Sequence, residues 1–218
     1  AGAEPASAPP RAAPGASPPA AAPPVTGTRV LLNLSEPSRA RAAAALPVDG
    51  VGLLRAELMI LEALDGTHPR RLIDAGRGGE VTDRLAAALT TFASAFAPRP
   101  VTYRTIDFRT NEFRGLAGGE EHEPVEANPM IGYRGALRYV REPDLLALEL
   151  DAIARVHDAG HHNLHAMLPF VRTERELAAC RELFATAGLL DRPGFELWVM
   201  AEVPSVLFAL DRYAALGI

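Results

Sequence analysis

The sequence predicts an α/β fold of the (β/α)8 TIM-barrel type, truncated after about five β/α units. Short apolar runs alternate with helical patterns from residue 28 onwards, which implies βαβ units and a parallel sheet. A polar residue stands at the end of most of these runs: Asn33, Arg55, Arg104 and Glu202. Barrel enzymes carry their active sites at the carboxyl ends of the strands, so this pattern favours a barrel, although an open doubly wound sheet also fits the alternation.

Five segments are expected to be strands because they are short and apolar and are bounded by turn residues or helical patterns. They are residues 29–34, 48–54, 99–106, 163–171 and 195–203. A complete barrel has eight strands and typically about 250 residues. Five strands would leave two open sheet edges and an uncovered apolar interior. We therefore expect the C-terminal part of the barrel to be missing, and the chain alone to be poorly soluble, marginally folded or a homo-oligomer.

Helices are expected over residues 37–46, 80–96 and 143–157, from Thr173 onwards, and from about Pro204 almost to the end. Pro37 suits the first turn of the first helix. The second helix has an apolar stripe at helical spacing, formed by Val81, Leu85, Leu89, Phe92 and Phe96. Thr173 and Glu176 have the spacing of a capping box at the start of the fourth.

The composition is that of one sizeable, mildly acidic domain. The 218 residues are 48% hydrophobic and carry a net charge of −5, which argues against nucleic acid or an anionic membrane as the main partner. Any anion site must therefore be a local cluster of arginines. The single cysteine, Cys180, excludes an intrachain disulfide and suits a reducing compartment. With neither a run of roughly 18 apolar residues nor a secretory signal pattern, we expect a cytoplasmic protein.

Residues 1–24 consist almost entirely of Ala, Pro, Gly and Ser. Such a segment has little apolar area to offset its ordering entropy, and its prolines favour an extended form. We expect residues 1–27 to be an interdomain linker or a disordered tail, and residues 28–218 to be the barrel domain.

Three arginines follow an apolar strand or lie in a glycine-rich turn: Arg55 in "GVGLLRAEL", Arg104 in "VTYRTIDF" and Arg134 in "NPMIGYRGALRY". A planar guanidinium binds phosphate and carboxylate groups bidentately, so three of them at one face would form an oxyanion clamp. Glu202 in "VMAEVPS" is the type of hard oxygen ligand that holds Mg²⁺ against a phosphate. Taken singly, an ion pair at the barrel rim is the more economical interpretation of any one arginine.

Four histidines close together in the sequence suggest a metal site at first sight: His157, His161, His162 and His165. His157 and His161 have the spacing of metal ligands on a helix. The pattern changes from helix to strand between His157 and His165, however, so the four are not expected to share a face. A solvated helix end is the preferred interpretation.

Four ordered segments are more specific than any single residue: "GVGLLRAELMILEALDGTHP", "RTIDFRTNEFRGLAGGEEHEPVEANPMIGYRGALRY", "MLPFVRT" and "VMAEVPS". Together they resemble the C-terminal phosphoenolpyruvate (PEP)-binding domain of the phosphoenolpyruvate synthases, or pyruvate, water dikinases. The resemblance covers residues 28–218. The segment "DFRTNEFRGLAGGEEHEP" resembles these enzymes most closely. Pyruvate phosphate dikinase and enzyme I of the sugar phosphotransferase system share the arginine and glutamate motifs but not this segment in this form.

The resemblance implies a (β/α)8 barrel that binds PEP and pyruvate with Mg²⁺ as cofactor. It assigns the phosphoryl contact to Arg55, further substrate contacts to Arg104 and Arg134, and Mg²⁺ binding to Glu202. In the family, a later S-N-D motif supplies a second metal ligand, and a cysteine near the C-terminus protonates the enolate of pyruvate. The sequence ends at "YAALGI", before either motif, and Cys180 lies on an apolar helix face. No proton donor is therefore expected within this chain.

The resemblance implies one half-reaction of a larger enzyme that converts ATP, pyruvate and water to PEP, AMP and phosphate. The enolate oxygen of pyruvate would take the phosphoryl group from a phosphohistidine on a swivelling domain. That domain and the ATP-binding domain are not in this sequence, and residues 1–24 are expected to be the tether to the former. The chain alone is expected to be inactive. The alternatives are a stand-alone or decayed PEP-binding module, and a fragment of an enzyme I-like phosphotransferase, against which the long segment argues.

Overall fold

The computed structural model describes residues 26–218. The linker expected at residues 1–27 lies almost entirely outside the described part and stays a prediction. Within residues 26–218, no helix combines the length and the apolar character needed to cross a membrane.

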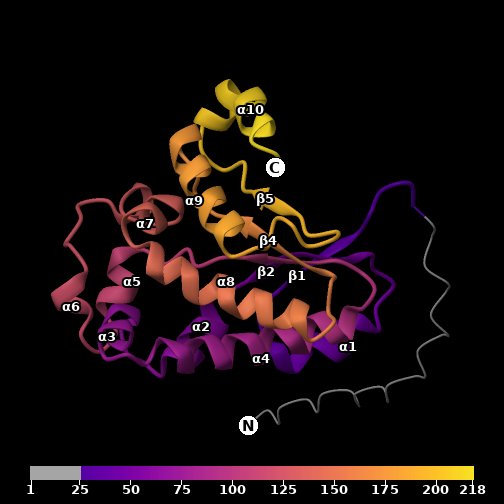
Figure 1. Ribbon diagram of the computed structural model, residues 1–218, viewed down its shortest axis with the longest axis horizontal. Helices are drawn as coiled ribbons and strands as arrows, with labels where there is room; N and C mark the ends of the chain where they lie inside the picture. The colour runs from indigo at the N-terminus through magenta and orange to yellow at the C-terminus, as the bar shows by residue number, and fades with distance from the viewer. Residues whose placement is uncertain (1–25) are drawn as a thin grey trace, which may run out of the picture.

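A single parallel sheet of five strands lies at the centre of the structure (Figure 1). The strands are β1 (Leu31–Leu34), β2 (Gly50–Arg55), β3 (Val101–Arg104), β4 (Leu164–Leu168) and β5 (Leu197–Val199). They pair in chain order, each parallel to the next. The five strands expected from the sequence and the α/β class are thus confirmed, although each strand is shorter than the apolar run that predicted it.

Helices connect successive strands. After β1 come the 3-10 turn η1 (Pro37–Arg39) and α1 (Ala40–Ala44), and after β2 come α2 (Glu57–Leu64), α3 (Pro69–Asp74) and α4 (Gly78–Phe96). Between β3 and β4 lie α5 (Thr110–Arg114), α6 (Gly119–His122), η2 (Pro129–Ile131), α7 (Ala136–Arg141) and α8 (Pro143–Asp158). The last helices are α9 (Glu174–Thr186) after β4 and α10 (Ser205–Ala215) after β5. The five expected helices are confirmed, whereas α2, α3, α5, α6 and α7 were not anticipated.

The main helix of each unit packs in the same order as the strands: α1 against α4, α4 against α8, α8 against α9, and α9 against α10 (Figure 1). Sequential parallel strands joined by right-handed crossovers place their helices on one side of a sheet, as in a barrel wall. Within residues 26–218, β1 and β5 each have one neighbouring strand. Leu31 of β1 and Trp198 of β5 are correspondingly 43% and 46% exposed. The arrangement is consistent with part of a barrel, and the closed barrel stays a prediction.

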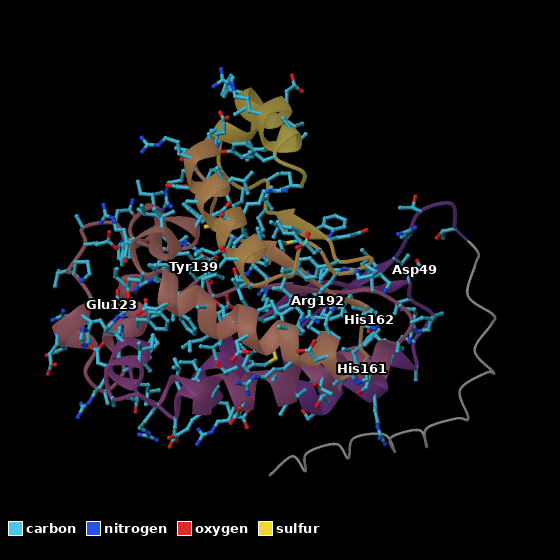
Figure 2. All side chains as sticks on the ribbon, viewed as in Figure 1. Asp49, Glu123, Tyr139, His161, His162 and Arg192 are labelled. Atoms are coloured by element: carbon cyan, nitrogen blue, oxygen red, sulfur yellow. The ribbon has the colours of Figure 1, made fainter. Side chains whose placement is uncertain are left out.

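The segment between β3 and α8 is fastened to α3 by a buried ion cluster. Glu123 accepts two hydrogen bonds from the Arg138 guanidinium, at 2.6 and 2.9 Å, and lies 2.9 Å from His68 Nε2. Burial alone would raise the pKa of Glu123, but hydrogen bonds from His68 and Arg138 outweigh it and lower the pKa. Glu123 lies at the end of the molecule opposite Asp49, His161 and His162 (Figure 2). The cluster therefore anchors the segment between β3 and α8, called the insertion below, to the start of α3 at one end of the molecule.

A second buried carboxyl group, Glu149 of α8, supports the end of β3. Glu149 Oε2 accepts hydrogen bonds from the Tyr103 hydroxyl at 2.7 Å and from the Ile106 backbone N–H at 3.0 Å. The Tyr139 hydroxyl lies 2.6 Å from Glu149 Oε1 and 3.0 Å from the Ile106 carbonyl oxygen. Burial raises the pKa of Glu149 to about 7. When Glu149 Oε1 is protonated, it donates a hydrogen bond to the Tyr139 hydroxyl oxygen. The Tyr139 hydroxyl can then donate its own proton to the Ile106 carbonyl oxygen.

The histidine group is not the solvated helix end that the sequence suggested. His157 is 1% exposed, and its Nε2 lies 2.8 Å from the Leu164 carbonyl oxygen, so it joins the end of α8 to the start of β4. His165 is also buried, within β4. Burial lowers the pKa of both imidazoles, which favours their neutral forms. The expectation held for His162, which is exposed, but a hydrogen bond to the neighbouring strand draws His157 into the core.

The glutamate of the buried ion cluster is predicted to be essential for stability. Glu123→Gln leaves the Arg138 guanidinium, which is 1% exposed, with only the more distant carboxylate of Glu142, at 3.5 Å. We expect the free energy of unfolding to fall by about 3 kcal/mol, because a buried charge loses its nearest carboxylate partner. Urea denaturation measures this loss. The control is Glu80→Gln in the exposed pair with Arg77, which is expected to change stability little. Equal losses of stability in the two variants would contradict the prediction that the buried ion cluster stabilises the fold.

Glu149 is predicted to make stability depend on pH in a defined direction. Because its pKa is raised from 4.5 to about 7 in the folded state, the folded protein binds this proton more tightly, and stability falls as the pH rises between these values. Glu149→Gln removes the titration and keeps the hydrogen bonds. Between pH 4.5 and pH 8 the variant should therefore gain about 2–3 kcal/mol relative to the parent, as measured by urea unfolding. Parallel pH profiles of the variant and the parent would refute this.

Candidate functional site

The carboxyl ends of β2 and β3 bring two of the predicted site arginines together. Arg55 and Arg104 are register partners in neighbouring parallel strands. Arg55 is exposed and makes no ion pair with any residue of the described part of the chain. It is therefore an uncommitted positive charge beside Arg104, at the edge of the sheet where the sequence predicted an anion site.

Arg104 is held by carboxylates on both sides. Its guanidinium pairs with Glu57, at the start of α2, through Nη2, and its Nη1 lies 3.4 Å from Asp107 Oδ2. Nη1 also approaches the Met200 sulfur, at 3.8 Å, in the segment that follows β5. Since the side chain is only 12% exposed, these contacts fix its direction.

Arg134 reaches the same carboxylate from the other side. Its Nε and Nη2 donate to the two oxygens of Asp107 at 2.9 and 2.7 Å, and its Nη1 donates to the Met130 carbonyl oxygen at 3.0 Å. The Asp107 side chain is 1% exposed, so this bidentate pair is shielded from water. Asp107 thus ties together Arg104 from β3 and Arg134 from the loop before α7.

Glu202 lies after β5, and its carboxylate is exposed. Its Oε1 accepts a hydrogen bond from the Phe170 backbone N–H at 2.7 Å. Within residues 26–218 no group of three or more His, Cys, Asp or Glu side chains is arranged to hold a metal ion. Mg²⁺ does not require such a group, because it commonly binds through one or two carboxylates together with phosphate oxygens and water. Glu202, with Oε2 free of protein hydrogen bonds among the described residues, fits that mode.

Two buried polar atoms in this cluster lack a hydrogen-bond partner among the described residues: Arg104 Nε and Glu57 Oε2. Nearly all buried polar groups in proteins are hydrogen-bonded, so an unsatisfied donor beside an unsatisfied acceptor needs an explanation. An acceptor oxygen would satisfy Arg104 Nε, whereas Glu57 Oε2 needs a donor such as a hydroxyl group or water. The cluster is thus suited to a polar ligand rather than to an apolar one, and Arg104 Nε is the atom that would bind an oxyanion.

The structure brings together all the predicted site residues through groups that the sequence analysis did not single out. Arg55 lies beside Arg104, Asp107 joins Arg104 to Arg134, and Phe170 contacts both Arg134 and Glu202. The signal for Asp107 was present, since an acidic residue three positions after a strand-end arginine is a natural partner for it. Nothing in the sequence pattern distinguished Phe170 from other apolar residues near β4.

Cys180, expected to be structural, is fully buried on α9. Its sulfur lies 3.8 Å from the Ala136 carbonyl oxygen, and burial raises the pKa of the thiol to about 12. A thiol with so high a pKa does not provide a reactive thiolate near neutral pH. The prediction that Cys180 is part of the core is confirmed.

Arginines gathered at the carboxyl ends of parallel strands are typical of an anion-binding α/β domain. The comparison with known protein families is specific: residues 13–216 match the family described as PEP-utilising enzyme, PEP-binding domain. The chain belongs to this family.

The curated relatives carry a consistent name. The chain is 45% identical over 194 residues to a probable phosphoenolpyruvate synthase of Pyrococcus horikoshii, covering 89% of this chain and 23% of that protein. The phosphoenolpyruvate synthase of Pyrococcus furiosus is 43% identical over 194 residues, with the same coverage of both chains. That of Deinococcus radiodurans is 39% identical over 211 residues, covering 86% of this chain and 27% of the relative. The chain thus spans about a quarter of the length of these relatives.

The carboxylate shared by the two arginines is predicted to stabilise the cluster. Asp107→Asn removes the charge that offsets the repulsion between Arg104 and Arg134. We expect the free energy of unfolding to fall by about 2 kcal/mol, since a largely buried ion pair loses one partner. Urea denaturation measures this loss. The control is Asp158→Asn, because Asp158 forms an ion pair with Arg192 but its side chain is exposed to solvent. A loss no greater than that of the control would show that Asp107 does not organise the arginines.

Proposed function

We propose that this chain is the PEP/pyruvate-binding domain of a phosphoenolpyruvate synthase. The observation that carries the proposal is the linked cluster of Arg55, Arg104 and Arg134 in a chain of the PEP-binding family. The names of the relatives support a synthase rather than an enzyme I-like phosphotransferase. The long segment between β3 and α8 supports the same choice.

The proposed reaction is phosphoryl transfer between a phosphohistidine and pyruvate. The enolate oxygen of pyruvate forms a bond to phosphorus while the phosphorus–nitrogen bond to histidine breaks. The whole enzyme would convert ATP, pyruvate and water to PEP, AMP and phosphate, with the phosphohistidine and ATP-binding domains as partners of this one. Phosphoryl transfer relies on positioning and on stabilisation of negative charge, which are the properties that clustered guanidinium groups supply.

The proposed roles follow the geometry. Arg55, exposed and free of ion pairs among the described residues, receives the phosphoryl oxygens. Arg104 and Arg134, already oriented by Asp107, bind the remaining phosphoryl or carboxylate oxygens. Because their carboxylate partners hold them in place, they lose little conformational freedom on binding. The protein's contribution is therefore an arginine cluster arranged before the substrate arrives.

Glu202 would hold Mg²⁺ through Oε2, with Oε1 retained by the Phe170 N–H. The ion would neutralise negative charge on the phosphoryl group and on the enolate. Cys180 is fully buried on α9, so it is not placed to exchange a proton with a substrate at the carboxyl ends of the strands. We accordingly propose that this chain binds ligand but does not complete the reaction by itself.

Titration calorimetry of PEP into the chain, in the presence of Mg²⁺, tests the proposal. Arg55→Ala should weaken PEP binding and raise its dissociation constant about tenfold or more, because a charge-assisted contact to the phosphoryl group is lost. Arg104→Ala should do the same. The matched control is Arg41→Ala, an exposed arginine of α1 that should leave the affinity unchanged. Absence of PEP binding in a folded sample, or equal affinity in the Arg55 and Arg41 variants, would reject the proposed function.

A further inference from the structure

Phe170 has an unusual backbone conformation at the edge of the site. It follows β4 by two residues, and its φ angle is +51°. The left-handed region is unfavourable for a bulky non-glycine residue, and such residues persist where surrounding contacts enforce them. The contacts that enforce this conformation involve two predicted site residues, Glu202 and Arg134.

The backbone of Phe170 is bonded to the predicted metal ligand. Its N–H donates to Glu202 Oε1 at 2.7 Å, which fixes one carboxylate oxygen and leaves the other for an ion. Protein groups that orient a metal-binding carboxylate in this way typically change metal affinity about 10- to 100-fold when they are removed. The left-handed conformation of Phe170 therefore bears directly on the direction of Glu202.

The ring of Phe170 contacts the predicted substrate ligand. The Arg134 guanidinium carbon lies 4.4 Å from the ring centroid, and that of Arg172 lies 4.5 Å from it. Both distances are within the range of cation–π attraction. The ring of Phe170 thus supports Arg134 in addition to the carboxylate of Asp107 and the carbonyl oxygen of Met130.

Arg172 holds the loop that carries Arg134 against this ring. Its guanidinium donates to the carbonyl oxygens of Gly132, Arg134 and Phe170. No carboxylate of the described residues forms an ion pair with it, so backbone carbonyls and the ring account for its position. Gly135 allows the close approach, because a Cβ there would lie 2.6 Å from the Phe170 Cβ. The loop and Phe170 are therefore packed too closely to move independently.

We propose that Phe170 is a positioning residue that couples the metal-binding carboxylate to the substrate-binding arginine. The inference rests on the proposed function, and it adds that one residue links the two halves of the site. Phe170 orients Glu202 through its backbone and supports Arg134 through its ring. A cation at Glu202 and an anion at Arg134 then each favour the same position of Phe170. Binding of Mg²⁺ and binding of PEP should accordingly strengthen each other beyond their direct attraction.

The test measures the ratio of PEP dissociation constants without and with Mg²⁺, by titration calorimetry of the chain. In the parent chain we expect Mg²⁺ to tighten PEP binding by about fivefold or more. Phe170→Leu keeps the apolar bulk but removes the aromatic face, and should reduce the ratio to less than about twofold. Phe170→Tyr keeps the ring and should restore the ratio. Glu202→Gln should abolish the effect of Mg²⁺, which locates it at this carboxylate.

Two further variants separate coupling from a general loss of structure. Phe208→Leu changes an 89% exposed ring on α10 and should leave the ratio at the parental value. Arg172→Lys keeps the charge but loses the planar guanidinium, and should lower the ratio even if Phe170→Leu fails to fold. Circular dichroism melts establish that each variant is folded.

The outcomes distinguish this inference from the proposed function. If the parent chain binds PEP and Arg55→Ala weakens it, while folded Phe170→Leu and Arg172→Lys keep the full Mg²⁺ effect, the coupling role is overturned and the function stands. A PEP-binding parent that shows no Mg²⁺ effect also overturns the coupling. If the folded parent binds no PEP, the proposed function fails, and the inference that rests on it fails with it.

Discussion

The site depends on one carboxylate, that of Asp107, which is shared by two arginines from different parts of the chain. Without a negative charge between them, Arg104 and Arg134 would repel each other, and each would keep only its other contacts, Glu57 for Arg104 and the Met130 carbonyl oxygen and Phe170 ring for Arg134. Asp107 can hold both because it is almost fully buried, so water competes little for its oxygens. The position of Asp107 depends in turn on the core, because buried Glu149 accepts hydrogen bonds from the backbone N–H of the preceding residue, Ile106, and from the Tyr103 hydroxyl. A network in the core thus fixes a strand end, and the strand end fixes the site.

The insertion between β3 and α8 has a double role in this arrangement. It supplies Arg134 to the site, and it is fastened to the rest of the domain through Glu123, Arg138 and His68. A loop that carries a charged ligand residue must be held firmly, because a displacement of about 1 Å can cost a large part of the function it serves. The buried ion cluster and the packing of Gly135 on Phe170 provide this rigidity at two separate points.

Strand and helix positions followed from the sequence because apolar periodicity is a local property. The stripe from Val81 to Phe96 and the cap at Thr173 predicted α4 and α9 correctly. Helix α2 was missed because "LRAELMIL" continues the apolar run of β2, and periodicity alone does not show where strand gives way to helix. His157 was misplaced because its burial depends on a carbonyl group seven residues away in the next strand.

The candidate site could be predicted only in part from the sequence, because sequence patterns are local and many of its contacts join distant residues. Arg55 and Arg104 were found because each ends a strand, and Arg134 and Glu202 because they lie in recognisable motifs. Glu57 contacts Arg104, 47 residues away, and Phe170 contacts Glu202, 32 residues away. No local sequence pattern predicts such pairs. Sequence reasoning thus singled out the charged groups of the candidate site, and the structure added the groups that hold them.

The order of the sheet also bears on how the chain acquires its structure during translation. Each strand pairs with the one synthesised just before it, so the frame can grow unit by unit as the nascent chain lengthens. Arg55 and Arg104 could take their places early in this process. Arg134 has its full set of contacts only once Phe170 has emerged, and Phe170 has its backbone partner only once Glu202 has been added. The five-stranded sheet can therefore begin to form before the charged side chains have all their partners, and these contacts are completed only when the segment after β5 has been synthesised.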